Sequence, residues 1–131
     1  MKIMICYDDS TPAMAALKLA QEHAKVWDAK LFIVNSITRE LPLKHSFIKE
    51  AEQKLENEIN DFLKGTSSPY ETHLLVSSHD VGEQLVGFAK RENIDQIFIG
   101  IIKKSKVGKL LFGSTAQYVI LSAPCPVVTT Q

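Results

Sequence analysis

The sequence lacks an excess of charge of either sign, which argues against one broad class of partner. Its 15 lysine and arginine residues balance 15 aspartate and glutamate residues, so the formal net charge at pH 7 is zero. Proteins that hold nucleic acid or an anionic membrane through their overall charge carry a strong basic surplus. We therefore expect neither nucleic acid nor a membrane among the partners.

Cysteine and long apolar runs are scarce as well. The two cysteines, Cys6 and Cys125, each lie inside an apolar stretch, which favours buried, reduced thiols over a disulfide framework or a metal site. No apolar run approaches membrane-spanning length, and the N-terminal stretch MKIMICYDDS is too short for a signal peptide. These absences lead us to expect a cytoplasmic protein without a metal site.

Familiar catalytic and phosphate-binding motifs are also missing. The four histidines show no metal-ligand spacing, and no Ser-His-Asp or Cys-His arrangement stands out. In the stretch GIIKKSKVGKLLFGST, residues 100–115, a Walker A loop would need Ser or Thr after the Gly-Lys pair, but Leu110 follows Gly108 and Lys109. A phosphate site in this stretch must therefore be built in another way.

The sequence does contain a regular alternation of short apolar runs and amphipathic stretches. Its 131 residues, 45% of them hydrophobic, suit one domain over residues 1–131. Strands are predicted within residues 2–7, 30–34, 71–76, 94–101 and 125–129, and helices begin near Ser10, Phe47, Asp80 and Ser114. The order β-α-β-α-β-α-β-loop-α-β predicts an α/β fold, with a parallel sheet covered by helices on both faces.

Local signals mark where two of these helices begin. Ser10 is a typical helix cap, with Pro12 in the first turn behind it. Asp80, followed three residues later by Glu83, has the form of a capping box. In the first helix, Trp27 continues the helical spacing of apolar residues, so we expect it on the apolar face.

Three predicted strands end in residues that suit a ligand. In an open parallel sheet, ligands bind at the carboxyl ends of the strands, where the strand order reverses. Asp8 follows the first strand and offers an acceptor to a ribose hydroxyl or a base amino group, and Val34 ends the second with backbone groups and an apolar wall. Gly100 ends the fourth strand, where the missing Cβ lets a ligand approach the backbone closely.

The start of the fourth helix completes the candidate site. Gly113, Ser114 and Thr115 offer hydroxyls and unpaired amides to an anion, at the positive end of the helix dipole. Four lysines of the preceding loop add point charges: Lys103, Lys104, Lys106 and Lys109. Simpler interpretations stay open here, namely a turn glycine and a helix cap at 113–114, a solvated lysine face, a capping role for Asp8 and a core position for Val34.

Four stretches of the chain resemble the universal stress protein family: ICYDDS, LFIVNS, HDVGEQLVGFAKRENIDQIFIG and GSTAQYVILSAPCPVV. The resemblance covers essentially the whole chain, and the ending is its most specific part. It implies a five-stranded parallel sheet in the order 3-2-1-4-5, a Rossmann-like fold similar to that of the adenine nucleotide alpha hydrolases.

The ATP-binding branch of this family carries the pattern Gly-x2-Gly-x9-Gly-Ser/Thr. On this chain the first glycine is Gly100 and the last pair is Gly113-Ser114, but the middle glycine falls on Lys103. A lysine there does not give the close backbone approach of glycine, although it brings a cation toward phosphates. The resemblance also places adenosine contacts on Asp8 and Val34.

A second departure from the family pattern lies beside Asp8. Asp9 stands where many members have glycine. A second carboxylate at this place either attracts a metal ion or weakens phosphate binding, and the sequence leaves both outcomes open.

The resemblance implies a stress-response or regulatory protein that binds ATP, ADP or AMP, with or without Mg²⁺. It also implies a homodimer paired through the last strand, Val127–Thr129, which as an apolar edge needs a partner or a cover. Two alternatives remain. One is a weak ATPase or autophosphorylating protein, for which the sequence supplies no clear catalytic base. The other is a member that has lost nucleotide binding and acts through dimerisation alone, for which Lys103 is the main argument.

Overall fold

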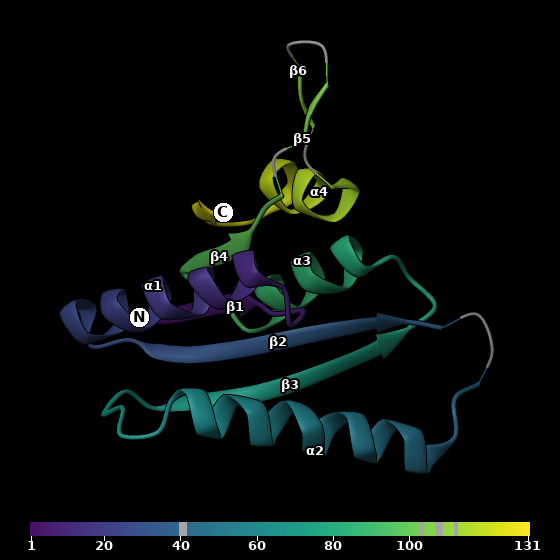
Figure 1. Ribbon diagram of the computed structural model, residues 1–131, viewed down its shortest axis with the longest axis horizontal. Helices are drawn as coiled ribbons and strands as arrows, with labels where there is room; N and C mark the ends of the chain where they lie inside the picture. The colour runs from purple at the N-terminus through teal and green to yellow at the C-terminus, as the bar shows by residue number, and fades with distance from the viewer. Residues whose placement is uncertain (40–41, 103, 107–108, 112) are drawn as a thin grey trace.

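Five parallel strands form the central sheet of the protein (Figure 1), which we describe from a computed structural model. The structure describes residues 1–39, 42–102, 104–106, 109–111 and 113–131, and the side chains of these residues outside 103–112. The strand order is β3-β2-β1-β4-β7, which confirms the predicted 3-2-1-4-5 order. The bounds are β1 Lys2–Cys6, β2 Lys30–Thr38, β3 Tyr70–Ser77, β4 Gln96–Gly100 and β7 Val127–Thr130.

Two helices cover each face of this sheet. Their bounds are α1 Thr11–Trp27, α2 His45–Phe62, α3 Val81–Arg91 and α4 Ser114–Ser122. On β1, Ile3 and Ile5 pack against α1 and α2, whereas Met4 and Cys6 pack against α3 and α4. Successive residues of a strand point to opposite faces, so a strand covered on both sides must be apolar throughout, as the run at residues 3–6 is.

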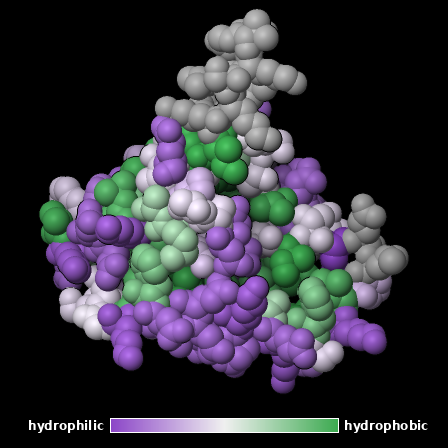
Figure 2. Space-filling view, viewed as in Figure 1, coloured by the Kyte–Doolittle hydropathy of each residue, from purple (hydrophilic) through white to green (hydrophobic). Residues whose placement is uncertain are grey.

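The outer surface is polar where helices face solvent. Only two residues of α2, Leu55 and Ile59, are buried, and the surface over this helix is largely hydrophilic (Figure 2). No helix within the described ranges is long and apolar enough to cross a membrane.

The two predicted helix caps have different outcomes. Ser10 does cap α1, because its hydroxyl accepts a hydrogen bond from the Ala13 N–H at 3.2 Å. Asp80 occupies the N-cap position of α3, but its side chain makes no capping hydrogen bond, so the predicted capping box is wrong. The Glu83 carboxylate lies instead 3.5 Å from Nδ1 of His79, the residue before the N-cap.

Trp27 is the second correction, because it is 60% exposed rather than part of the apolar face. It is the last residue of α1, and the chain leaves the helix at Asp28 in a left-handed conformation with φ 51°. Ala24 and Ala29 take the buried positions at this end. The helical spacing therefore predicted the face correctly up to the last turn only.

The segment between β4 and α4 is not the plain loop expected from the sequence. Strand β5, Lys104–Lys106, pairs antiparallel with β6, Lys109–Leu111, and this hairpin stands away from the main sheet (Figure 1). Pairing with each other satisfies backbone groups that the main sheet does not reach. Lys103 and Gly108 lie outside the described residues.

Candidate functional site

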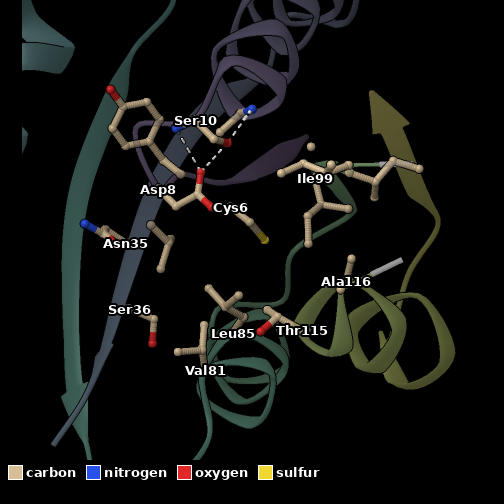
Figure 3. Close-up of a pocket in the computed structure, with 17 residues that line it drawn as sticks. Cys6, Asp8, Ser10, Asn35, Ser36, Val81, Leu85, Ile99, Thr115 and Ala116 are labelled. Atoms are coloured by element: carbon tan, nitrogen blue, oxygen red, sulfur yellow. Dashed lines mark hydrogen bonds between the residues drawn. The ribbon is translucent and has the colours of Figure 1, made fainter. Parts of the chain in front are cut away.

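A cleft of about 200 Å³ opens at the carboxyl ends of β1, β2 and β4 (Figure 3). The strand order reverses here, since β1 connects outward to β2 on one side and pairs with β4 on the other. The start of α4 and one side of α3 complete its walls. The lining residues are Cys6, Tyr7, Asp8, Ser10, Ala13, Val34, Asn35, Ser36, Val81, Leu85, Ile99, Gly100, Ile101, Ile102, Gly113, Thr115 and Ala116.

Asp8 lines this cleft and also supports the start of α1. Its Oδ1 accepts hydrogen bonds from the Ser10 N–H at 3.1 Å and from the Ser10 hydroxyl at 2.5 Å (Figure 3). Ser10 in turn caps the helix. Within the described part of the chain, Oδ2 of Asp8 has no hydrogen-bond partner, so the capping role and an acceptor role toward a ligand are compatible.

Val34 contributes a wall to the cleft rather than a backbone contact. Its side chain is fully buried, and its carbonyl oxygen already accepts a hydrogen bond from the Tyr7 N–H at 2.9 Å. Pairing of β1 with β2 ends with Cys6 opposite Val34. Backbone groups of alternate residues in a strand point to the same side, so Ser36 is the first residue whose N–H and C=O face the space beyond β1. Sequence reasoning missed Ser36 because it ended this strand at Val34, whereas β2 runs on to Thr38.

At position 100, glycine is required by the packing of α1 against β4, with or without a ligand. A Cβ at this position would lie 2.3 Å from the carbonyl carbon of Pro12 and 2.5 Å from the Ala13 nitrogen. These are backbone atoms in the first turn of α1, which therefore can approach β4 only over a residue without a side chain. The hydroxyl of Thr130 donates to the Pro12 carbonyl at 2.9 Å and ties β7 to the same turn.

The predicted anion-binding residues lie at the start of α4, and they do not all face the same space. Gly113 occupies the N-cap position with φ −62° and lines the cleft, and apart from its chain neighbours no atom that the structure describes lies within 4 Å of where a Cβ would be. Thr115 lines the cleft too, but Ser114 is exposed and lines only a neighbouring hollow. Within the described ranges no side chain caps α4, so the amides at its start have no side-chain acceptor among those residues.

The neighbouring hollow, about 430 Å³, lies between the starts of α3 and α4. It shares Val81 and Thr115 with the cleft, so the two spaces adjoin. The remaining lining residues are Thr38, Asp80, Gly82, Glu83, Ser114 and Tyr118. Two uncapped helix starts favour an anion in this hollow, whereas the carboxylates of Asp80 and Glu83 oppose one.

The four predicted lysines cannot be placed in the site. Lys103 lies outside the described residues, as do the side chains of Lys104, Lys106 and Lys109. A phosphate-binding role for any of them stays a prediction.

Cys6, expected from the sequence as a buried thiol, also lines the cleft. Its sulfur points into the cleft (Figure 3). Burial, together with the nearby charge of Asp8, raises the pKa of Cys6 to about 12, so the thiol stays neutral and weakly nucleophilic at pH 7. Cys125 is also free but only half-buried. The expected reduced thiols are therefore present, and only Cys6 is deeply buried.

A charged cluster beside the cleft explains what Asp9 does. Asp9 has φ 66°, and Lys54 lies 3.9 Å from its Oδ2 and 3.8 Å from Oε1 of Glu58. The Tyr7 hydroxyl donates to Glu58 at 3.2 Å. Hydrogen bonding between the two carboxyls lowers the pKa of Asp9 and raises that of Glu58. Asp9 thus pairs with α2, and among the described residues no group of three or more His, Cys, Asp or Glu side chains is arranged for a metal ion.

Comparison with known proteins matches this fold and chain to one family. Residues 1–131 match the model of the Universal stress protein family. A universal stress protein from Thermus aquaticus is 31% identical over 132 residues, covering 96% of this chain and 95% of its own.

Two solved structures from Archaeoglobus fulgidus extend this likeness to three dimensions. One universal stress protein has a TM-score of 0.82 at 31% identity, covering all of this chain and 93% of its own. Another, solved in complex with dAMP, has a TM-score of 0.78 at 27% identity and covers all of this chain and 98% of its own.

Proposed function

The chain belongs to the universal stress protein family, and from the cleft at its strand ends we propose that it binds an adenine nucleotide as a regulatory protein. The observation that carries this proposal is the convergence of three features on one cleft. An acidic acceptor, Asp8, lies on one side, the uncapped start of α4 on another, and apolar residues such as Val34 and Leu85 line the space between. A dAMP complex of a relative with 27% identity supports the same choice of ligand.

The base and sugar occupy the cleft in this proposal, and the phosphates extend toward α4. A space of about 200 Å³ is below the range of roughly 300–1,000 Å³ typical of pockets for larger ligands. The cleft therefore holds the nucleoside, and the phosphates extend out of it. Oδ2 of Asp8 accepts from a ribose hydroxyl, the amides at Gly113–Thr115 bind the phosphates, and Lys103 adds charge. ATP is the proposed ligand, with ADP and AMP as the alternatives and Mg²⁺ as a counter-ion of the phosphates.

The binding test compares two changes at Asp8. Asp8→Asn keeps an oxygen for the two hydrogen bonds from Ser10 but turns the other acceptor into an NH₂ donor. We expect calorimetric titration to show affinity for ATP, ADP or AMP in the wild type and a loss of about tenfold or more in Asp8→Asn. Asp61→Asn, the same change at an exposed site on α2, is the matched control and should bind as wild type does.

Two outcomes would contradict parts of this proposal. A wild type with no measurable affinity for any adenine nucleotide at about 1 mM would leave dimerisation as its function. Release or transfer of phosphate over hours with Mg²⁺ would show an enzyme instead of a regulatory protein.

We further propose that the protein is a homodimer paired through β7. This strand lies at the edge of the sheet with β4 on one side only. Val127 and Val128 are half-buried, and Leu121 on the adjoining α4 is 81% exposed. A free edge strand flanked by apolar surface is a template for pairing with a second copy.

The edge of β7 offers a sharp test of the dimer. The carbonyls of Pro126 and Thr130 accept bonds from β4 and the residue after it, so the backbone of Thr129 points to the open edge. Thr129→Pro removes that outward N–H without touching the pairing with β4. Sedimentation equilibrium should show a dimer for the wild type and for Thr129→Val, and a monomer for Thr129→Pro. A monomeric wild type would refute the pairing.

A further inference from the structure

Gln84, on α3, is a buried polar side chain next to the cleft, 8% exposed. Its Nε2 donates to the carbonyl oxygens of His79 at 2.8 Å and Ile37 at 3.3 Å. Its Oε1 accepts from the hydroxyl of Ser36 at 2.8 Å. The amide therefore connects the end of β2 with the turn that leads into α3, and all three of its hydrogen bonds lie within the protein.

These neighbours leave the amide only one orientation. If the side-chain amide of Gln84 were turned over, its oxygen would face two carbonyl oxygens, and two acceptors repel each other. The nitrogen must therefore face Ile37 and His79, and the oxygen must face Ser36. Because that oxygen can only accept, the hydroxyl hydrogen of Ser36 is committed to Gln84.

The commitment of this hydrogen fixes what Ser36 can offer to a ligand. Ser36 lines the cleft from β2, opposite Val81 of α3 (Figure 3). Its oxygen keeps lone pairs but has no hydrogen to give, so a group that meets it in the cleft must be a donor. The 6-amino group of adenine is a donor, whereas the 6-oxo group of hypoxanthine or guanine is an acceptor.

We propose that Ser36, held by Gln84 as a positioning residue, selects a 6-amino purine over a 6-oxo purine in this cleft, an inference that rests on the proposed nucleotide binding. The 6-oxo group of such a purine would either face the lone pairs of Ser36 or force the Ser36 hydroxyl to turn away from Gln84. Turning the hydroxyl leaves a buried amide oxygen without a donor, which is costly. We expect AMP to bind about tenfold or more tightly than IMP, which differs from AMP only at the 6-position and the hydrogen it places on N1.

Variants of Ser36 test the hydroxyl directly. Ser36→Ala removes the hydroxyl but keeps the backbone N–H and C=O of residue 36, so any change in selectivity reports the side chain alone. In calorimetric titrations the ratio of the IMP to the AMP dissociation constant should fall to near one in Ser36→Ala. Ser36→Thr keeps a hydroxyl at the same place and should retain the wild-type ratio.

A variant of Gln84 tests the positioning role. Gln84→Met has similar length and no acceptor for Ser36, so the serine hydroxyl becomes able to donate to a 6-oxo group. The expected result is a gain in IMP affinity relative to AMP, with Ser36 still present. In the double variant Ser36→Ala/Gln84→Met the ratio should equal that of Ser36→Ala, because Gln84 acts only through Ser36. Thermal unfolding checks each fold, and if Gln84→Met does not fold, the Ser36 variants decide.

The outcomes separate this inference from the proposed function. Equal affinity of the wild type for AMP and IMP, or an unchanged ratio in Ser36→Ala, overturns the selectivity role and leaves nucleotide binding in place. A wild type that binds neither nucleotide overturns both.

Discussion

Gly100 and Gly113 both line the cleft, yet a side chain would meet opposite surroundings at the two positions. At Gly100 a Cβ would overlap the backbone of Pro12 and Ala13, the closest approach being 2.3 Å. At Gly113 no described atom beyond the chain neighbours lies within 4 Å of a Cβ, and the φ of −62° suits any residue. Neither glycine is required by a left-handed backbone.

This difference shows that the two glycines of the sequence pattern are present for different reasons. The glycine of β4 allows the packing of α1 on the sheet, so its replacement tests the fold. The glycine before α4 leaves open space at the cleft, so its replacement tests the ligand. A motif that contains both residues is thus partly a folding signal and partly a binding signal.

The largest effect is expected at the tight position. Gly100→Ala should destabilise the protein by about 3 kcal/mol, because the clashing atoms belong to the backbone of α1 and cannot move aside cheaply. Urea unfolding at constant m-value measures this loss. A variant as stable as the wild type would show that α1 does not approach β4 as closely as described.

Replacing Gly113 should have the opposite consequence, a large effect on nucleotide affinity and a small one on stability. Gly113→Val is expected to weaken nucleotide affinity about tenfold or more, because its branched side chain enters the space proposed for the phosphates. It should cost less than about 1 kcal/mol in stability, the usual effect of replacing a glycine cap. Titration and urea unfolding of Gly113→Ala and Gly113→Val, compared side by side, check both effects. Equal affinity in all three proteins would place the ligand elsewhere.

Asp9 sharpens the comparison, because here the backbone does favour glycine. Its φ of 66° is left-handed, a region that aspartate tolerates and glycine adopts freely. Asp9→Gly should therefore stabilise the protein by about 0.5 kcal/mol at pH 7, the gain being limited by the greater freedom of glycine in the unfolded chain. Thermal unfolding measures the change, and a clear loss of stability would mean that the ion pair with Lys54 outweighs the backbone strain.

The smallest expected effect is a change in stability at Glu58, the carboxyl that hydrogen-bonds to Asp9. It tests the charge interaction of Asp9 without changing the Asp9 backbone. The pKa of Glu58 is raised above its ordinary value of 4.5 by its hydrogen bond with Asp9. Stability from this group is thus fully present below pH 4.5 and is lost as the pH rises through the raised pKa. Glu58→Gln, which resembles the protonated form, should match the wild type near pH 4 and exceed it toward pH 7.

The size of this gain is limited by solvent. Because the Glu58 side chain is 34% exposed and its neighbours Asp9 and Lys54 are more exposed still, solvent screens the interaction, and we expect roughly a few tenths of a kcal/mol at most. Urea unfolding over this pH range measures it. A gain that grows toward low pH instead would contradict the direction of the Glu58 shift.

Parts of the candidate site could be read from neighbouring residues, and parts could not. Asp8, Gly113 and Thr115 lie around one cleft at the carboxyl edge of the sheet, whereas Ser114 lines a neighbouring hollow. Their binding roles stay predictions. Val34 was expected to offer its backbone, but pairing with Tyr7 occupies its carbonyl. The partner of a backbone group is set by the length of the neighbouring strand, which local patterns do not contain.

The sequence by itself determined the layered architecture, because residues 3–6 are apolar at every position and a strand of that kind must be covered on both faces. It also determined the start of α1, where Ser10 and Pro12 act through local geometry. Only the tertiary structure decided why residue 100 is glycine and why the Ser36 hydroxyl is a donor to Gln84. Pro12 lies 88 residues from Gly100 along the chain, and Gln84 lies 48 residues from Ser36. Contacts at such separations form only when the whole sheet is assembled.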